Sequence, residues 1–349
     1  MLNIPRSNVI KGWEWLGDRI SYPEPDVKGD TFPMTWANDG EIYTSAGDPC
    51  WGETHDGLDI EKFSGYPPDY KIVKVNPMND YRGWGGMGPK PTGMICVDGI
   101  LYLAFQNLRG TQRAPHSLRS QHGSDAHIVY AICDNSGHGV GAWTPALSNI
   151  TMVMFPGYKF GGPAFVNFGQ NNANARDDYV YAVSSDQWDN GSNLRLGRVP
   201  KDCIVSGELW EWVCAFTPSG EPVWSHDLEA AIPVLSLHKY IGLPEMVYLA
   251  GLGRYLLLTW RLHKDFSGDD GTDLIIFESP EPWGPFYLVH FEEYWEGKSF
   301  TPYCPRVPLK WMKPDGISGW LQFSGSWSKT GQKSGYYRSH VRPFRLKLA

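Results

Sequence analysis

Two aspartates, Asp30 and Asp48, flank a predicted β-hairpin and could act as a catalytic pair. The hairpin runs from Phe32 to Tyr43 and turns near Asp39, and each aspartate is nine positions from that turn. Antiparallel pairing would bring both carboxylates to the open end of the hairpin. Such a pair can hydrolyse a glycosidic bond, because one carboxyl protonates the leaving oxygen while the other activates water or attacks the sugar. Either aspartate alone would more often cap a turn. The symmetric pairing favours catalysis, although it fixes neither inversion nor retention.

Further candidates stand at or before the first strands of later hairpins. Glu245 precedes the apolar segment 246–260, where a carboxylate is costly to desolvate. We expect it to be a third catalytic acid, with a structural role as the alternative. Lys90, Tyr303 and Arg306 occupy comparable positions, and we predict that they bind substrate.

Two loops rich in hydrogen-bonding groups, 120–125 and 185–193, are suited to contacting sugar hydroxyls. They supply His122, Asp125 and Trp188 as predicted substrate contacts. His122 could also bind a metal ion, but it has no partner at ligand spacing, so hydrogen bonding is the favoured role. The sequence predicts no cofactor and no metal ligands, and it leaves open a structural ion in a central channel.

Aromatic rings are expected around the same site. Trp84 lies in a glycine-rich stretch, Trp188 in a polar loop and Tyr303 before the last predicted inner strand. A carboxylate pair needs a sugar held beside it, and flat rings with polar tips stack on sugar faces. We therefore predict that these three rings surround the channel mouth that holds Asp30 and Asp48.

One pattern recurs five times along the chain: an apolar strand, a tight turn and a second apolar strand. The turns centre near Asp39, Asp98, Asp177, Leu252 and Asp315. Asp-Gly, which tolerates the positive φ angles of a tight hairpin, occupies three of them. Successive centres lie 59, 79, 75 and 63 positions apart, a spacing suited to four-stranded propeller blades. The prediction is a single all-β domain, residues 1–349, folded as a five-bladed β-propeller. Two stacked sandwiches would not explain five matching hairpins.

The chain ends should complete the ring. We expect residues 9–20 to pair beside residues 342–348, which would cover the last sheet edges. No linker or low-complexity run marks a second domain.

The composition of the chain limits the classes of molecule that it can bind. The net charge of −7 and the lack of a Lys/Arg stripe exclude a nucleic-acid backbone as a partner. No apolar run reaches the roughly 20 residues that span a bilayer, and no export signal is visible at residues 1–6, so we expect a cytoplasmic protein unless a leader has been removed. The 16 Trp and 18 Tyr exceed what a core needs and suit a carbohydrate partner. The oligomeric state is not predicted.

The six cysteines show no metal-binding or redox spacing, and we expect buried free thiols.

Several segments resemble a known family. They are 29–48, 178–181 with 196–202, 250–258 and 277–285. These segments resemble the five-bladed β-propeller glycosidases, and within them the bacterial and fungal domain family of formerly unknown function that includes D-arabinan-cleaving endo-glycosidases. The resemblance spans nearly the whole chain, but only the first hairpin carries a mechanism. It implies that Asp30 and Asp48 are the acid and the base, and our working assignment takes Asp30 as the base or nucleophile and Asp48 as the acid.

Glycoside hydrolysis, of a furanoside, an arabinan-like chain or a short oligosaccharide, is therefore the leading hypothesis. A polysaccharide lyase could instead use His122, Tyr303 and Arg306 to neutralise a uronate and remove its C5 proton. A third possibility is a sugar-binding propeller without catalysis, in which the aspartates only accept hydroxyl protons.

Overall fold

The structure is a computed structural model of the chain, and it describes residues 4–52, 54–55, 57–78, 81, 88–108, 123–132, 149–150, 152–263, 271–326 and 335–349. This part of the chain is all-β. Its helices are single 3₁₀ turns: η5 (Gln170–Asn172), η6 (Lys201–Cys203), η7 (Gly207–Leu209), η8 (Leu228–Ala230) and η9 (Leu309–Trp311). None of the described helices is long and apolar enough to cross a membrane.

The strands form four sheets, the largest of which divides into two antiparallel parts, and we describe them as five groups that follow one another along the chain apart from β1 and β2. Group 1 contains β3 (Val27–Asp30), β4 (Met34–Trp36), β5 (Ile42–Trp51), β6 (Thr54–His55), β7 (Leu58–Ser64) and β8 (Lys71–Asn76). Group 2 contains β9 (Lys90–Val97), β10 (Ile100–Gln106) and β11 (His127–Ile132). Group 3 contains β12 (Ala164–Asn167), β13 (Tyr179–Ser185), β14 (Gly191–Pro200), β15 (Glu211–Phe216), β16 (Pro222–Ser225) and β17 (Leu235–Ile241).

Group 4 contains β18 (Glu245–Leu249), β19 (Arg254–Leu262), β20 (Thr272–Ser279) and β21 (Tyr287–Trp295). Group 5 contains β22 (Tyr303–Arg306), β23 (Ser318–Gly325), β24 (Arg338–Leu348), β1 (Ile10–Trp15) and β2 (Ile20–Ser21). Groups 3 and 4 share one sheet through a short parallel pairing of β12 with β18.

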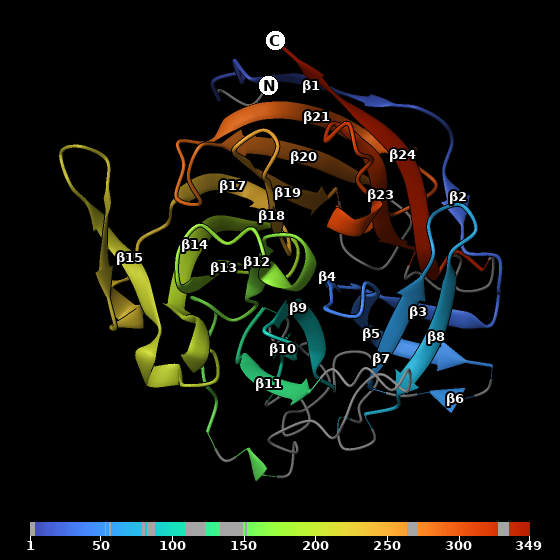
Figure 1. Ribbon diagram of the computed structural model, residues 1–349, viewed down its shortest axis with the longest axis horizontal. Helices are drawn as coiled ribbons and strands as arrows, with labels where there is room; N and C mark the ends of the chain where they lie inside the picture. Colours follow the sequence, from blue (N-terminus) through green and yellow to red (C-terminus); the bar gives the residue numbers. More distant parts are fainter. Residues whose placement is uncertain are drawn as a thin grey trace.

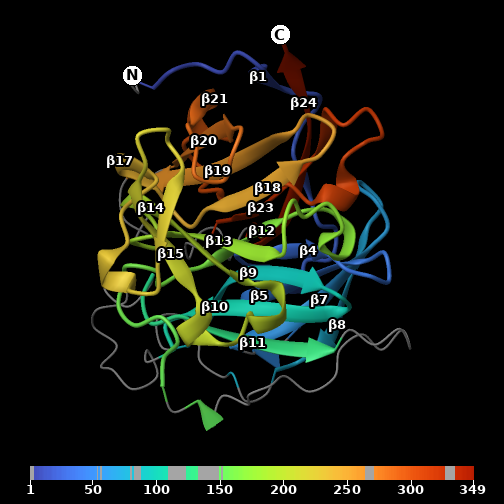
Figure 2. The same cartoon turned by 60° about the vertical axis from the view of Figure 1, so that its left-hand side comes forward.

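The inner strands of the five groups contact one another in a closed circuit. β9 contacts β4 and β12, β18 contacts β12 and β22, and η9, which follows β22, contacts β4. In Figure 1 the strands β4, β9, β12 and β18 lie near the middle, while β8, β11 and β21 lie toward the periphery. β15 lies at the left-hand side of the molecule in Figure 1 and comes forward in Figure 2. The strands β4, β9, β12, β18 and β22 are therefore the inner strands, and the site was expected at one end of them.

The two chain ends pair as predicted. β1 runs antiparallel to β24, with Ile10 opposite Leu348 and Trp15 opposite Phe344. β2 pairs with the same strand through Ile20 and Val341. The N-terminal segment thereby covers the outer edge of the last strand in the chain.

Each interface between neighbouring groups holds its own apolar cluster. Adjacent residues of one strand face opposite neighbours: Leu256 packs with Leu321 of group 5, whereas Leu257 packs with Tyr181 of group 3. Strands buried on both faces read as continuous apolar runs, which explains the unbroken segment 255–258.

The last inner strand differs from the prediction. The sequence pattern placed it from Val307 onward, but β22 ends at Arg306 and the chain then forms the 3₁₀ turn η9. Pro308 explains the difference, because proline has no amide hydrogen for a strand ladder. Tyr303 and Arg306 consequently lie within the strand and not ahead of it.

Candidate active site

Asp30 and Asp48 meet at one end of group 1, as the sequence predicted. Asp30 ends β3 and pairs with Gly47 of β5, which is the neighbour of Asp48. Both side chains are buried, with 5% and 2% of their residue surface exposed. Left-handed backbone at Thr31 (φ 62°) and Asp48 (φ 46°) shapes this end of the hairpin. Such conformations are unfavourable for residues with a Cβ atom and concentrate at functional sites.

Gly47 makes room for the Asp30 carboxylate. A Cβ atom at this glycine would lie 2.5 Å from Oδ1 of Asp30 and 3.3 Å from Cδ of Pro91. The first separation is shorter than real Cβ atoms show and the second is tight, so a larger residue here would displace the Asp30 carboxyl.

Lys90, the first residue of β9, pairs with Asp48. Its Nζ lies 2.8 Å from Asp48 Oδ1, and both side chains are buried. The sequence predicted that Lys90 binds substrate, but in the structure its ammonium group is held by the aspartate. A fixed positive charge next to a buried carboxyl group favours the ionised form of that carboxyl.

Two tyrosines approach Asp30. The Tyr303 hydroxyl donates to Asp30 Oδ2 at 2.9 Å, and the Tyr337 hydroxyl lies within hydrogen-bonding reach of the Gly47 carbonyl at 3.3 Å. Tyr303 was predicted to stack on sugar, but it is fully buried and its polar tip is directed at the carboxylate. The sequence analysis missed Tyr337, because nothing in its neighbourhood distinguishes it from the other tyrosines that precede strands.

The environment raises the pKa of Asp30 to about 7. Burial is the largest cause, and the negative charge of Asp48 adds to it. Lys90 and hydrogen bonds from the hydroxyls of Tyr303 and Tyr337 act in the opposite direction. The two carboxyls are therefore unlike: Asp48 has a cation at hydrogen-bond distance, whereas Asp30 holds its proton up to neutral pH.

A wall of aromatic rings stands behind Asp30. The ring centroids of Trp188 and Tyr303 are 5.6 Å apart, and Trp260 lies 5.2 Å from Trp188 and 5.7 Å from Tyr303. Trp188 is thus next to Tyr303, as predicted, but only 7% of it is exposed. In the described structure its ring supports Tyr303 and offers little face to a sugar. Nothing in the sequence singles out Trp260, which lies within the apolar strand β19.

Arg306 anchors the backbone beside Asp30. Its Nε donates to the Thr31 carbonyl at 3.2 Å, and Nη1 donates to the Pro244 carbonyl at 3.0 Å. It is 1% exposed. The prediction that Arg306 binds substrate is therefore not supported, because its guanidinium joins groups 1, 4 and 5 inside the protein.

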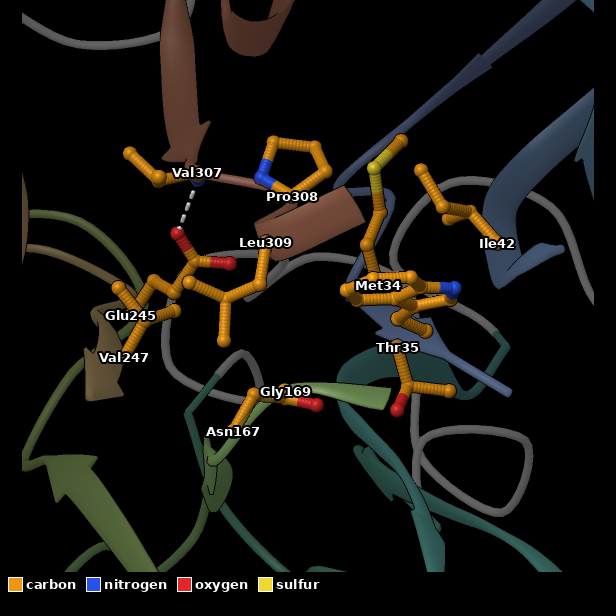
Figure 3. A pocket seen from close by; sticks show the side chains of 11 residues that line it. Met34, Thr35, Ile42, Asn167, Gly169, Glu245, Val247, Val307, Pro308 and Leu309 are labelled. Atoms are coloured by element: carbon orange, nitrogen blue, oxygen red, sulfur yellow. Dashed lines mark hydrogen bonds between the residues drawn. The ribbon is translucent and has the colours of Figure 1, made fainter. Parts of the chain in front are cut away.

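Glu245 lies deeper in the centre of the molecule. Its Oε2 accepts a hydrogen bond from the Val307 amide at 2.5 Å, as Figure 3 shows. Burial raises its pKa to about 7, against the opposing effects of Arg306 and the Val307 amide. The carboxyl faces a hollow of about 10 Å³ lined also by Met34 and Asn167, and that is room for roughly one water molecule. No sugar ring fits there, so the geometry does not support Glu245 as a catalytic acid.

Of three other predicted substrate contacts, the structure describes only Asp125. Asp125 has left-handed backbone (φ 54°), and its Oδ1 accepts from the Gly157 amide at 3.0 Å, which indicates a loop-fixing role. Trp84 and His122 lie outside the described residues. Two of the three residues of the lyase hypothesis already have partners inside the protein, since Tyr303 donates to Asp30 and Arg306 donates to backbone carbonyls.

No group of three or more potential metal ligands occurs among the described residues. Within the same ranges Cys50, Cys96 and Cys304 are buried, as expected, whereas Cys203 and Cys214 are partly exposed.

By sequence, no family model and no protein of curated function matches the chain. The resemblance to the D-arabinan-cleaving family is therefore not confirmed and stays a prediction. Solved structures do share the fold. A hydrolase candidate from Bacteroides ovatus is similar at 13% identity over 94% of this chain and 87% of its own, with a TM-score of 0.60.

Two glycosidases align along nearly their whole length. The α-L-arabinofuranosidase of Podospora anserina, solved with cellotriose, has 12% identity, a TM-score of 0.54 and coverage of 98% of this chain and 99% of its own. The RS223 β-xylosidase has 11% identity, a TM-score of 0.50 and 95% coverage of both chains. Both are β-propeller glycoside hydrolases. The likeness concerns the fold, and the residues of the site must carry any inference on activity.

Proposed function

We propose that this chain is a glycoside hydrolase, folded as one five-bladed β-propeller, that cleaves a glycosidic bond with Asp30 and Asp48. The five antiparallel groups, their closed circuit of inner strands and the β-propeller glycosidases of similar fold support the architecture. The unlike environments of the two carboxyls support the activity, because hydrolysis of a glycoside needs one protonated and one ionised group.

The contacts favour Asp30 as the acid. Its pKa of about 7 keeps it substantially protonated at neutral pH, so it can donate a proton to the leaving oxygen as the C–O bond breaks. Asp48, beside Lys90, is the ionised partner that activates water or attacks the anomeric carbon. These roles are the reverse of the working assignment made from the sequence.

The substrate class is a neutral pentoside, either a furanoside in an arabinan-like chain or a short oligosaccharide. The family resemblance and the names of the arabinofuranosidase and the xylosidase support this choice.

The test is a screen of arabinans, xylans and aryl pentosides with product analysis. Asp30→Asn and Asp48→Asn should each lower turnover by at least about 10³-fold without unfolding, a loss typical of a catalytic carboxyl. Asp98→Asn is the matched control, since this aspartate has a largely exposed side chain at another hairpin turn. Wild-type turnover in either active-site variant would refute the assignment. Binding without turnover in the wild-type chain would favour a carbohydrate-binding protein.

A further inference from the structure

A groove lies on the side of groups 3 and 4 opposite to the two aspartates. Its residues come from the turn before β13, from the turn between β20 and β21 and from the tip of the β15–β16 hairpin. They are Arg176, Asp177, Tyr181, Glu221, Tyr255, Glu281, Pro282 and Trp283. Asp30 and Lys90 stand at the opposite ends of the inner strands, so the groove is separate from the candidate active site. Its volume of about 260 Å³ exceeds the roughly 10 Å³ of each hollow in the centre.

Planar charged groups lie at the base of the groove. Arg176 donates to both carboxylate oxygens of Glu281, from Nη1 at 2.7 Å and from Nη2 at 3.1 Å. The two side chains remain 42% and 33% exposed, so a ligand can reach them. A bidentate pair holds both groups in one plane, and its outward N–H and oxygen atoms are fixed in advance for a ligand.

Aromatic rings line and flank the groove: Trp283 lines it, and Trp224 lies beside Trp283. Trp283 and Trp224 are partly exposed, and their centroids are 6.5 Å apart at an interplanar angle of 85°. Trp224 belongs to the β15–β16 hairpin, which projects from the rest of group 3 in Figure 1 and stands forward in Figure 2. The Tyr181 hydroxyl donates to Asp177 Oδ2 at 2.7 Å, so these two lining residues are fixed to each other. Exposed tryptophan beside fixed polar groups is typical of a binding site, not of a core.

The charges select the ligand class. One arginine faces Glu281, Glu221 and Asp177, so an anionic ligand such as a uronate or a phosphate would be repelled. A neutral sugar offers hydroxyls for the planar polar groups and C–H faces for the rings. We propose that this groove is a second, non-catalytic binding site for a neutral oligosaccharide segment, and that it holds the polymer whose bonds the active site cleaves. Only the claim that the bound polymer is also the substrate of the active site rests on the proposed function.

The test is affinity electrophoresis of the full chain in gels that contain arabinan, arabinoxylan or hydroxyethylcellulose. Trp283→Ala should weaken retention by at least one of these polymers about ten-fold, as expected for loss of one stacked ring with its buried area. Arg176→Ala should act in the same direction. The matched control is Tyr158→Ala, which removes an exposed ring elsewhere and should change nothing. Melting temperatures of all variants verify folding.

Turnover of a small aryl pentoside separates this proposal from the previous one. Trp283→Ala should leave that turnover unchanged, whereas Asp30→Asn should abolish it and keep polymer retention. Retention that depends on Trp283 in a chain without any turnover would support the groove and refute the hydrolase. Retention that survives both groove substitutions, or no retention of the wild-type chain by any of the three polymers, would overturn the groove.

Discussion

The Lys90 ammonium lies 2.8 Å from Asp48 Oδ1 at a position where both side chains are at least 95% buried. Lys90→Met should therefore destabilise the protein by about 3–5 kcal/mol at pH 7, because it leaves a buried carboxylate without its cation. The deficit should shrink at pH 5, since Asp48 without the Lys90 charge can then take up a proton. Urea unfolding at both pH values measures it. Lys201→Met removes an exposed pair with Asp98 and should cost less than about 1 kcal/mol. An equal cost for the two variants would contradict the importance of the buried pair.

The pH dependence of turnover should report the proton on Asp30. If Asp30 is the acid, activity falls as pH rises through about 7, where this carboxyl loses its proton. Tyr303→Phe removes a hydrogen bond that favours the ionised form of Asp30, so the pKa of Asp30 should rise. The alkaline side of the pH–activity profile should therefore shift to higher pH. The control is Tyr43→Phe, which removes a hydroxyl bound to Asp39 at the far end of the same hairpin. Activity that increases through pH 7 would instead make Asp30 the base.

Asp30 should also limit stability. Its folded pKa of about 7 exceeds the unfolded value of about 3.9, so its destabilising effect is absent below pH 4 and grows as pH rises to about 7. Asp30→Asn removes this group and should become more stable than the wild type by up to about 4 kcal/mol above pH 7. The comparison is urea unfolding at pH 4 and pH 8. A stability difference between variant and wild type that is the same at both pH values would show that Asp30 ionises normally.

The sequence predicted the parts of the fold that depend on local signals. The hairpin turns at Asp39, Asp98 and Asp315 were found because Asp-Gly supplies the positive φ angles these turns need, and the structure has them at Gly40, Gly99 and Gly316. The pairing of the two chain ends followed from the need to cover a sheet edge. The β15–β16 hairpin was missed, since its strands carry no Asp-Gly turn and lie outside the repeated pattern.

The site could be predicted only in part, for a physical reason. Asp30 and Asp48 belong to one hairpin, and their proximity follows from its symmetry. The partners that make them unlike come from far along the chain: Lys90 is 42 positions from Asp48, and Tyr303 is 273 positions from Asp30. Sequence spacing cannot assign such contacts, so it placed Lys90 and Tyr303 near the two aspartates without indicating that Lys90 pairs with Asp48 or that Tyr303 donates to Asp30.

Gly47→Ala tests whether the position of the Asp30 carboxyl determines activity. The added Cβ atom would lie 2.5 Å from Asp30 Oδ1, so the carboxyl must move by about 1 Å to restore contact distance. A displacement of this size in a catalytic group typically lowers turnover about 10²-fold. The backbone of β5 pairs through main-chain atoms on both sides and can keep its ladder, so the melting temperature should change little relative to the loss of activity. Gly251→Ala is the matched control, because nothing lies within 4 Å of the Cβ atom it would add. Equal activity of the two variants would show that the Asp30 carboxyl takes no part in the reaction.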